Sequence, residues 1–200
     1  MARTTVHLVR HGEVYNPKKI LYGRMPGYHL SSRGNSMAVA TSKFFRGRDV
    51  TYLAASPLER AQETARPIAE VTGCEVQTRA DILEAGNTFE GLRTKGWRSQ
   101  LINPVRWRHM TNPLEPSWGE PYQEIFQRMW GAVEDARDTA EGHEAVLVSH
   151  QLPIVMVQRH VQGKPLAHAS RNCDLASVTS LVFDGGDVVD WAYTTPAQHI

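Results

Sequence analysis

The chain has 200 residues, of which 41% are hydrophobic, and its formal net charge is +1. A chain of this size buries one sizeable core and little more, so we expect a single domain over 1–200. The balanced charge excludes the excess of Lys and Arg that polyanion binders gather on one face, and we expect no nucleic-acid partner.

No apolar run approaches the ~20 residues that a membrane-spanning helix needs. The first residues lead directly into a strand-like stretch rather than a signal peptide, so we expect a cytoplasmic protein with no membrane partner. The two cysteines, Cys74 and Cys173, show neither a pairing motif nor metal-ligand spacing. We expect both to be inert structural thiols.

Short apolar runs along the chain predict buried strands. These runs are 5–9, 51–55 and 145–148. Helical spacing follows the second and the third run, and this alternation is typical of an α/β protein with parallel strands. A further strand is predicted to end near Leu83. Near the C-terminus, 177–183 and 188–193 flank Asp184-Gly185-Gly186-Asp187 and predict a hairpin.

The segment after the second run carries helix start signals. Ser56 can cap the helix, Pro57 suits its first position, and Glu59 completes a capping box with Ser56. Arg60 is therefore expected in the first turn. The residues that recur at helical spacing form the inward face, and they are Leu58, Ala61, Ala65, Ile68 and Ala69.

Two more helices are predicted in the second half of the chain. The first runs from about Pro121 to Ala140, and the second starts near Pro153 and ends before Gly163. The inward residues of the first are Ile125, Met129, Ala132, Val133 and Ala136. Before the first of these helices, the segment 87–119 has no clear periodicity. This predicts an irregular excursion that covers the substrate.

Basic and imidazole side chains follow the predicted strands, where an open parallel sheet binds its ligands. Arg10 and His11 come after the first strand, Arg60 follows the second, and His150 follows the third. Such a concentration of donors suits a phosphate dianion. His11 could be a nucleophile, a general base or a ligand, and Gly12 behind it indicates a tight turn that aims the ring outward.

Phosphoryl transfer is the chemistry that this set of residues favours. A neutral imidazole at His11 is a competent nucleophile towards phosphorus, and the neighbouring cations would stabilise the equatorial oxygens of the transferring group. Glu84, after the predicted fourth strand, is the best-placed acid for the leaving alkoxide. Holding its proton would require burial or a nearby anion.

Three motif blocks span nearly the whole chain in one order. They are Val9-Arg10-His11-Gly12-Glu13, Ser56-Pro57-Leu58-Glu59-Arg60-Ala61-Gln62-Glu63-Thr64-Ala65 and Val148-Ser149-His150. In these blocks the chain resembles the histidine phosphatase superfamily, also called phosphoglycerate mutase-like proteins. The resemblance implies a three-layer α/β/α sandwich with a mostly parallel central sheet.

The same resemblance implies a role for each core residue. His11 would become the phosphohistidine, and Glu84 would be the proton donor. Phosphate would be bound by Arg10, Arg60 and His150.

Other residues match the family pattern less closely. Asn16 is similar to a family asparagine that touches phosphate, but it lies one position earlier than in the commoner pattern. Glu90-Gly91 resembles a short family motif after the acid. Gln151 stands where the family usually has glycine, so it either narrows the pocket or adds a hydrogen-bond donor. Arg24 is weighed evenly between contact with an acidic substrate and packing on an aromatic ring.

The remaining histidines lack partners at metal spacing, and we expect no metal and no cofactor. His29 and His168 lie in loops flanked by glycine or serine that could reach the pocket mouth. No further enzyme class shows its signature, since neither a nucleophile elbow, a phosphate-binding P-loop nor a zinc-protease helix motif is present.

The acceptor of the phosphoryl group stays open at this point. We expect a metal-independent phosphomonoester hydrolase that acts on a small phosphorylated metabolite. The alternatives are a phosphoglycerate-type mutase and a phosphate-binding regulatory module without turnover. Mutases of the family resemble a longer design with an extra shielding segment, and the shorter chain favours hydrolysis because an abbreviated cover admits water. An edge strand could also pair across the axis of a homodimer.

Overall fold

The computed structural model describes residues 3–93, 119–167 and 172–200. Its strands form one six-stranded sheet in the order β3-β2-β4-β1-β5-β6. The strands are β1 (Thr4–Arg10), β2 (Val50–Ala55), β3 (Val76–Thr78), β4 (Glu144–Ser149), β5 (Val178–Asp184) and β6 (Asp187–Thr194). The helices are α1 (Ser32–Ser42), a short 3-10 helix η1 (Lys43–Phe45), α2 (Glu59–Thr72), α3 (Tyr122–Thr139) and α4 (Gln151–Val161).

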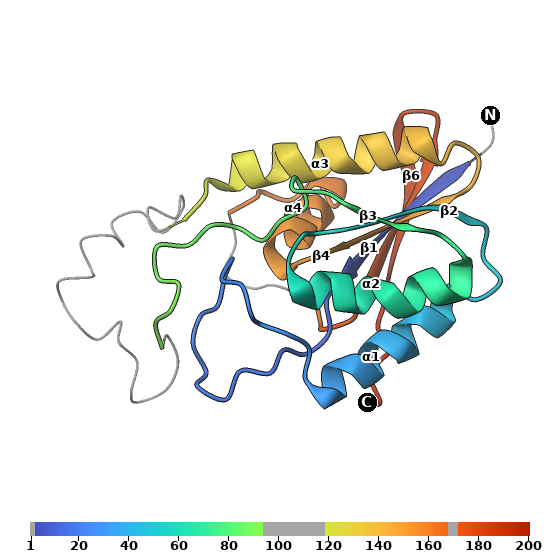
Figure 1. Ribbon diagram of the computed structural model, residues 1–200. Helices are drawn as coiled ribbons and strands as arrows, with labels where there is room; N and C mark the ends of the chain where they lie inside the picture. Colours follow the sequence, from blue (N-terminus) through green and yellow to red (C-terminus); the bar gives the residue numbers. More distant parts are fainter. Residues whose placement is uncertain (1–2, 94–118, 168–171) are drawn as a thin grey trace.

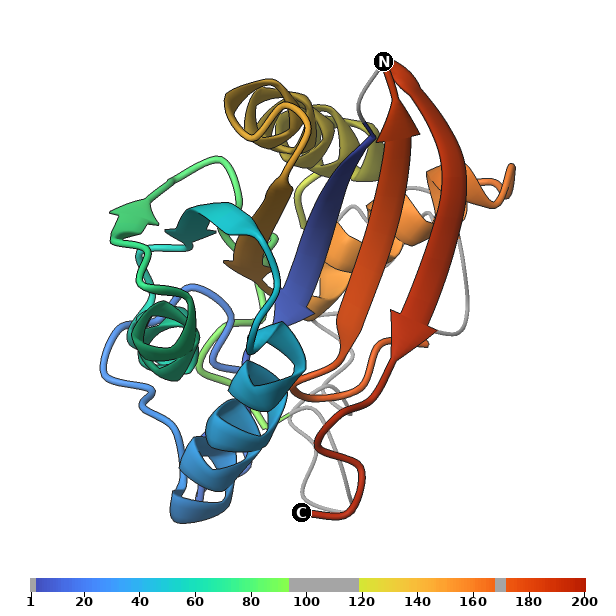
Figure 2. The same cartoon turned by 90° about the vertical axis from the view of Figure 1, so that its right-hand side faces the viewer.

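The sheet lies between two pairs of helices (Figure 1). α1 and α2 pack together on one face, and α3 and α4 pack together on the other. β1, β4, β2 and β3 are parallel neighbours, whereas β5 is antiparallel to β1 and β6 is antiparallel to β5. Figure 2 shows β6 at the outer edge of the sheet. The predicted three-layer sandwich, its mostly parallel sheet and its terminal hairpin are confirmed.

Side chains from the two faces of the sheet enter separate cores. Val6 and Leu8 of β1 pack with α3 and α4, whereas Val9 packs with α2. The predicted inward residues of α3 are all fully buried, and they are Ile125, Met129, Ala132, Val133 and Ala136. On α2 the predicted inward residues are buried except Ala69, which is half-buried. Within the described ranges, no helix is long and apolar enough to cross a bilayer.

Three parallel strands end level at one edge of the sheet. The last residues of β1 and β2 pair with the last two residues of β4. The residues that follow these strands are His11, Ser56 and His150, which therefore emerge close together. This is the edge at which open α/β sheets bind their ligands.

The predicted strand that ends near Leu83 is wrong. The strand beside β2 is β3, and the chain leaves the sheet well before Leu83. Arg79 grips the carboxylate of Asp81 with two donors, and the Leu83 N–H donates to the Ala80 carbonyl at 3.2 Å. These bonds close a turn that an extended strand could not contain.

The predicted capping box of α2 does not form. α2 begins at Glu59 without a side-chain cap. The Ser56 hydroxyl lies 2.7 Å from Nε2 of His150, and the Glu59 carboxylate accepts the Gly27 N–H at 2.9 Å. Both side chains are thus engaged outside the helix, while Arg60 lies in the first turn as expected.

The sequence indicates α1 and α4 to different extents. α1 has a clear start, because Ser31 accepts the Gly34 N–H at 2.9 Å, but its buried side is built mostly of small and polar residues and carries too weak an apolar pattern to predict. α4 begins at Gln151 rather than near Pro153, and it ends before Gly163 as predicted.

The loop after β1 touches the first turn of α1 backbone to backbone. A Cβ on Gly34 would overlap the Glu13 carbonyl oxygen, and a Cβ on Gly12 would lie 2.6 Å from the Gly34 carbonyl oxygen. Both positions require glycine because a side chain cannot approach a backbone so closely. The contact fixes the segment that follows His11 against α1.

We expect Gly34→Ala to lower the free energy of unfolding by about 2 kcal/mol, because the methyl group has no room beside a backbone carbonyl. Gly131→Ala is the matched control, since its Cβ would meet nothing within 4 Å. In the interior of α3, this control should raise the free energy of unfolding by up to about 1 kcal/mol. Urea denaturation measures both, and equal tolerance of the two substitutions would contradict the close contact.

Candidate active site

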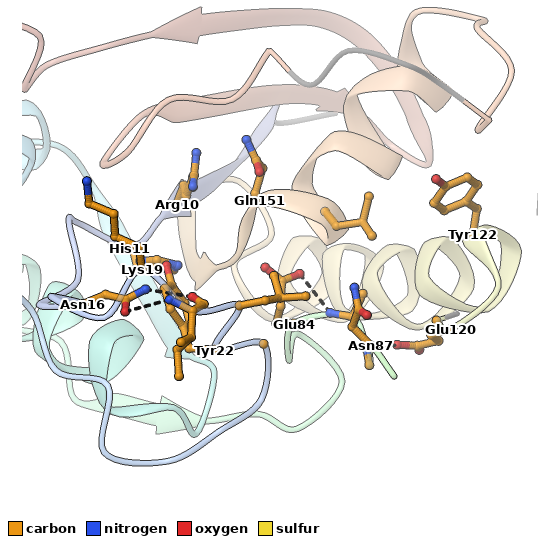
Figure 3. A pocket seen from close by; sticks show the side chains of 17 residues that line it. Arg10, His11, Asn16, Lys19, Tyr22, Glu84, Asn87, Glu120, Tyr122 and Gln151 are labelled. Atoms are coloured by element: carbon orange, nitrogen blue, oxygen red, sulfur yellow. Dashed lines mark hydrogen bonds between the residues drawn. The ribbon is translucent and has the colours of Figure 1, made fainter. Parts of the chain in front are cut away.

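A cavity of about 450 Å³ opens at the carboxyl edge of the sheet. Its walls come from the end of β1 and the loop after it, from the segment 84–87 and from the start of α4 (Figure 3). The predicted site residues that line it are Arg10, His11, Asn16, Glu84 and Gln151.

Only one ring nitrogen of His11, Nε2, is available to react. The side chain is only 2% exposed, and its Nδ1 lies 2.8 Å from the Gly12 carbonyl oxygen. A carbonyl can only accept, so Nδ1 carries the proton and donates. In the neutral ring, Nε2 therefore keeps the lone pair that a nucleophile needs.

The ionisation of His11 is controlled by burial and by neighbouring arginines. Burial lowers its pKa well below the ordinary value of 6.5, and the charges of Arg60 and then Arg10 lower it further. The hydrogen bond to Gly12 opposes these effects but does not outweigh them. His11 is thus neutral, and nucleophilic, at neutral pH.

His150 lies beside His11, with their ring centroids 5.2 Å apart. Burial, followed by the charges of His11 and Arg60, lowers the pKa of His150 well below 6.5. Its Nε2 lies 2.7 Å from Ser56 Oγ, and its buried Nδ1 has no hydrogen-bond partner in the described part of the chain. The tautomer in which Ser56 donates to Nε2 leaves the Nδ1–H of a neutral ring free to bind an anion.

Two arginines bring further donors that have no partner. Arg60 is fully buried, and its Nη2 donates to the Gly23 carbonyl at 2.6 Å. Its guanidinium also lies over the ring of Tyr22, 4.8 Å from the centroid. Among the described residues, Nε and Nη1 of Arg60 and Nε of Arg10 find no acceptor. Each buried donor left without a partner costs roughly 1–3 kcal/mol of stability. A bound anion would satisfy these donors, so their grouping indicates an anion-binding site.

Hydrogen bonds at the strand ends hold these groups in place. The Gly12 N–H donates to Thr64 Oγ1 at 3.1 Å, and Thr64 donates in turn to the Arg60 carbonyl at 2.7 Å. On the other side, Ser149 Oγ donates to the Ile82 carbonyl at 2.7 Å. These bonds join the loop that begins at His11 to α2, and they join the segment that precedes Glu84 to β4.

Glu84 lies in the cavity wall, in the same cavity as His11 (Figure 3). Its carboxylate accepts the Ala85 N–H at 2.9 Å, and its own carbonyl accepts Arg24 Nε at 2.6 Å. The structure thus places a carboxyl group in one cavity with the imidazole of His11.

Two further predicted residues line the cavity with part of their polar groups engaged. Asn16 Nδ2 donates to the Ile20 carbonyl at 2.8 Å and Oδ1 accepts the Ile20 N–H at 3.2 Å, so this amide closes the loop after β1. Gln151 Nε2 donates to the Cys173 carbonyl at 3.3 Å. The phosphate contact expected of Asn16 therefore stays a prediction. Gln151 lines the cavity at the start of α4, and both roles considered for it stay predictions.

Arg24 and the loop histidines lie elsewhere. Arg24 is not among the cavity-lining residues, and its guanidinium binds Glu120 at 2.7 Å and the Glu84 carbonyl. His29 is exposed and paired with Glu63, and it does not line the cavity. His168 and most of the predicted excursion 87–119 lie outside the described residues.

The cavity also contains polar residues that no motif indicates. They are Lys19, Tyr22, Asn87, Glu120 and Tyr122. They lie in loops or at the first turn of α3, where hydrophobic periodicity does not identify binding residues. The one available signal is their place in segments that follow strand ends, where binding residues concentrate.

Among the described residues, the thiols and the metal-binding residue types form no second centre. Cys74 and Cys173 are both free, and burial raises the pKa of the Cys173 thiol to about 11, as expected of inert structural cysteines. Over 3–93, 119–167 and 172–200, no group of three or more His, Cys, Asp or Glu side chains could hold a metal ion.

Solved structures share this architecture. The structure named Bacillus stearothermophilus YhfR superimposes with a TM-score of 0.78 at 25% identity, covering 93% of this chain and 95% of its own. A mycobacterial glucosyl-3-phosphoglycerate phosphatase, Rv2419c, superimposes with a TM-score of 0.73 at 22% identity, covering 96% and 98%.

Sequence relatives extend over the same length. The protein of Mycobacterium tuberculosis strain H37Rv named uncharacterized protein Rv0525 is 49% identical over 196 residues, which is 97% of each chain. A probable phosphoglycerate mutase, GpmB, of Enterobacter sp. is 29% identical over 187 residues, covering 86% of this chain and 83% of its own. The family model of the histidine phosphatase superfamily, branch 1, matches residues 6–193, so the chain belongs to this superfamily.

Proposed function

We propose that the protein is a metal-independent phosphomonoester hydrolase that acts through a phosphohistidine on His11. The observation that carries the proposal is the set of buried donors without partners in the described structure: Arg10 Nε, Arg60 Nε, Arg60 Nη1 and His150 Nδ1. These residues are close enough for their charge or ring to act on His11. A neutral imidazole and donors suited to a phosphoryl group thus lie near one another, which supports phosphoryl transfer.

In the first half of the reaction, Nε2 of His11 attacks phosphorus. The N–P bond forms while the bond from phosphorus to the ester oxygen breaks. Glu84, protonated at this stage, gives its proton to that oxygen, so the alcohol leaves neutral. Arg10 and Arg60 stabilise the negative charge on the equatorial oxygens.

In the second half, water attacks the phosphohistidine. The Glu84 carboxylate accepts a proton from the water, the N–P bond breaks, and inorganic phosphate leaves. His11 recovers the lone pair on Nε2, and each group returns to its starting state. We propose metal independence because the guanidinium groups supply the positive charge that metal ions supply in many phosphoryl-transfer enzymes.

The acceptor decides between a phosphatase and a mutase. The superfamily contains both kinds of enzyme, and the Enterobacter relative is named a probable phosphoglycerate mutase. We favour water because the chain is shorter than the mutase design that it resembles, and a shorter cover excludes water less well. A cavity of about 450 Å³ suits a small phosphorylated metabolite as the substrate.

We expect the protein to release phosphate from p-nitrophenyl phosphate, with the same rate in the presence of a chelator. With 3-phosphoglycerate and a bisphosphoglycerate primer, isomerisation should be negligible. Fast isomerisation without phosphate release would instead show a mutase. Binding of vanadate with neither turnover nor an acid-labile phosphoryl label would show a binding module.

His11→Asn should lower kcat for p-nitrophenyl phosphate by at least about 10³-fold, because the nucleophile is lost. It should also abolish acid-labile labelling of the protein. His143→Asn is the control, since His143 is exposed just before β4, at the opposite end of that strand from His150, and binds Asp49. Retention of turnover or label by His11→Asn rules out the phosphohistidine.

We expect a pH dependence of stability from the lowered pKa values of His11 and His150. Above an ordinary histidine pKa of about 6.5, both rings are neutral in the folded and unfolded chain. Below it, the unfolded chain takes up protons that the folded chain refuses, so the free energy of unfolding falls as pH decreases. Each ring contributes a slope of up to about 1.4 kcal/mol per pH unit.

Urea denaturation of the wild type and of the His11→Asn/His150→Asn variant, from about pH 5 to pH 7.5, measures this effect. The variant should show the shallower dependence on pH. Identical slopes for the two proteins would mean that the histidines are not held neutral by the fold.

A further inference from the structure

One arginine on α3 holds the backbone that precedes Glu84. Arg128 Nη1 donates to the Asp81 carbonyl at 2.7 Å and to the Leu83 carbonyl at 2.6 Å. The other side of the same guanidinium grips Glu120, with Nε 2.7 Å from Oε1 and Nη2 3.1 Å from Oε2. Arg128 therefore joins α3 to the loop that carries the acid.

A second arginine, Arg24, binds the same loop. Arg24 Nε donates to the carbonyl of Glu84 itself at 2.6 Å, and Arg24 Nη2 donates to Glu120 Oε2 at 2.7 Å. That oxygen also accepts the Gly86 N–H at 3.3 Å. One carboxylate thus connects both arginines, and backbone groups from 81 to 86 are bound on either side of Glu84.

The carboxyl group of Glu84 depends on this backbone for its position. Its only hydrogen bond within the described ranges is the one it accepts from the Ala85 N–H, which belongs to the same loop. The loop lies in no helix or strand, so no ladder of hydrogen bonds fixes it. Glu84 and Glu120 both line the cavity (Figure 3).

The connecting carboxylate stays ionised. Burial alone would raise the pKa of Glu120, but the hydrogen bonds and charge of Arg128, with the Gly86 N–H and Arg24, lower it below its ordinary value. Arg128 and Glu120 are 19% and 17% exposed, so water screens this pair less than a surface pair.

We propose that Arg128 and Arg24, joined by Glu120, form a clamp that positions Glu84 for proton transfer to the leaving group. This inference rests on the proposed function. The three clamp residues are positioning residues that act through Glu84. If the clamp only stabilised the loop, its loss would lower the stability of the fold. Its loss would not lower the rate more for a basic leaving group than for a weakly basic one.

Two esters of similar shape separate the two roles. p-Nitrophenolate leaves readily without a proton, whereas phenolate from phenyl phosphate is more basic and needs the acid. The measured quantity is kcat/KM, which covers the steps up to loss of the alcohol. A positioned general acid contributes about 10²–10⁴-fold to such a step, so a loosened one should lose about 10-fold.

Arg128→Lys is the first variant, because it keeps the positive charge that also acts on His150 but cannot make the same set of bonds. We expect kcat/KM to fall about 10-fold for phenyl phosphate and less than about twofold for p-nitrophenyl phosphate. Arg24→Gln should show the same selective loss. Because the Arg24 side chain is half-exposed, we expect this variant to fold normally. Arg137→Gln on the same helix is the matched control, since Arg137 pairs with Asp138 away from the cavity.

A double-mutant cycle completes the test. In a Glu84→Gln background, Arg128→Lys should cause no further selective loss for phenyl phosphate, because the group that it positions is gone. Equal losses for both esters, or additive losses in the cycle, overturn the clamp while leaving the phosphatase intact. A wild-type protein that hydrolyses neither ester overturns the proposed function itself.

Discussion

A charge buried at the end of a sheet is the constraint on which this structure depends. Arg60 is fully inaccessible, yet its guanidinium donates one hydrogen bond, to the Gly23 carbonyl, and lies over the ring of Tyr22, while Nε and Nη1 have no hydrogen-bond partner among the described groups. Burial lowers the pKa of Arg60, although Tyr22, Glu84 and other groups oppose this. Removing such an ion from water costs several kcal/mol, so the surrounding fold must supply the stability that the site does not.

The same charge acts on His11, the residue that we propose as the nucleophile. Burial lowers the pKa of His11 most, and the charge of Arg60 lowers it further, so the cation that would hold a phosphoryl group also helps to keep the imidazole neutral. The level ends of β1, β2 and β4 make this possible, since they bring His11, Ser56 and His150 to one point. In the proposed mechanism, binding and activation would therefore both follow from a single arrangement of strands.

Much of this arrangement could be predicted because periodicity and strand-end rules apply to it. Strands β1, β2, β4, β5 and β6, the inward face of α3 and the placement of His11, Arg60 and His150 after strand ends follow from local patterns. The errors lie where tertiary contacts take over. Ser56 has the sequence of a helix cap, but its hydroxyl binds His150, a residue far away in the chain. The turn before Glu84 is held by Arg128 of α3 and by Arg79, which also binds Asp135, and no local pattern reveals these distant partners.

The hydrogen bond from Nδ1 of His11 to Gly12 has a stereochemical consequence. A flip of the imidazole about its χ2 bond would break this bond inside a region that is almost inaccessible to water. The ring is thus locked in one orientation. Any electrophile captured by this histidine becomes attached to Nε2 alone, and the adduct forms as a single regioisomer.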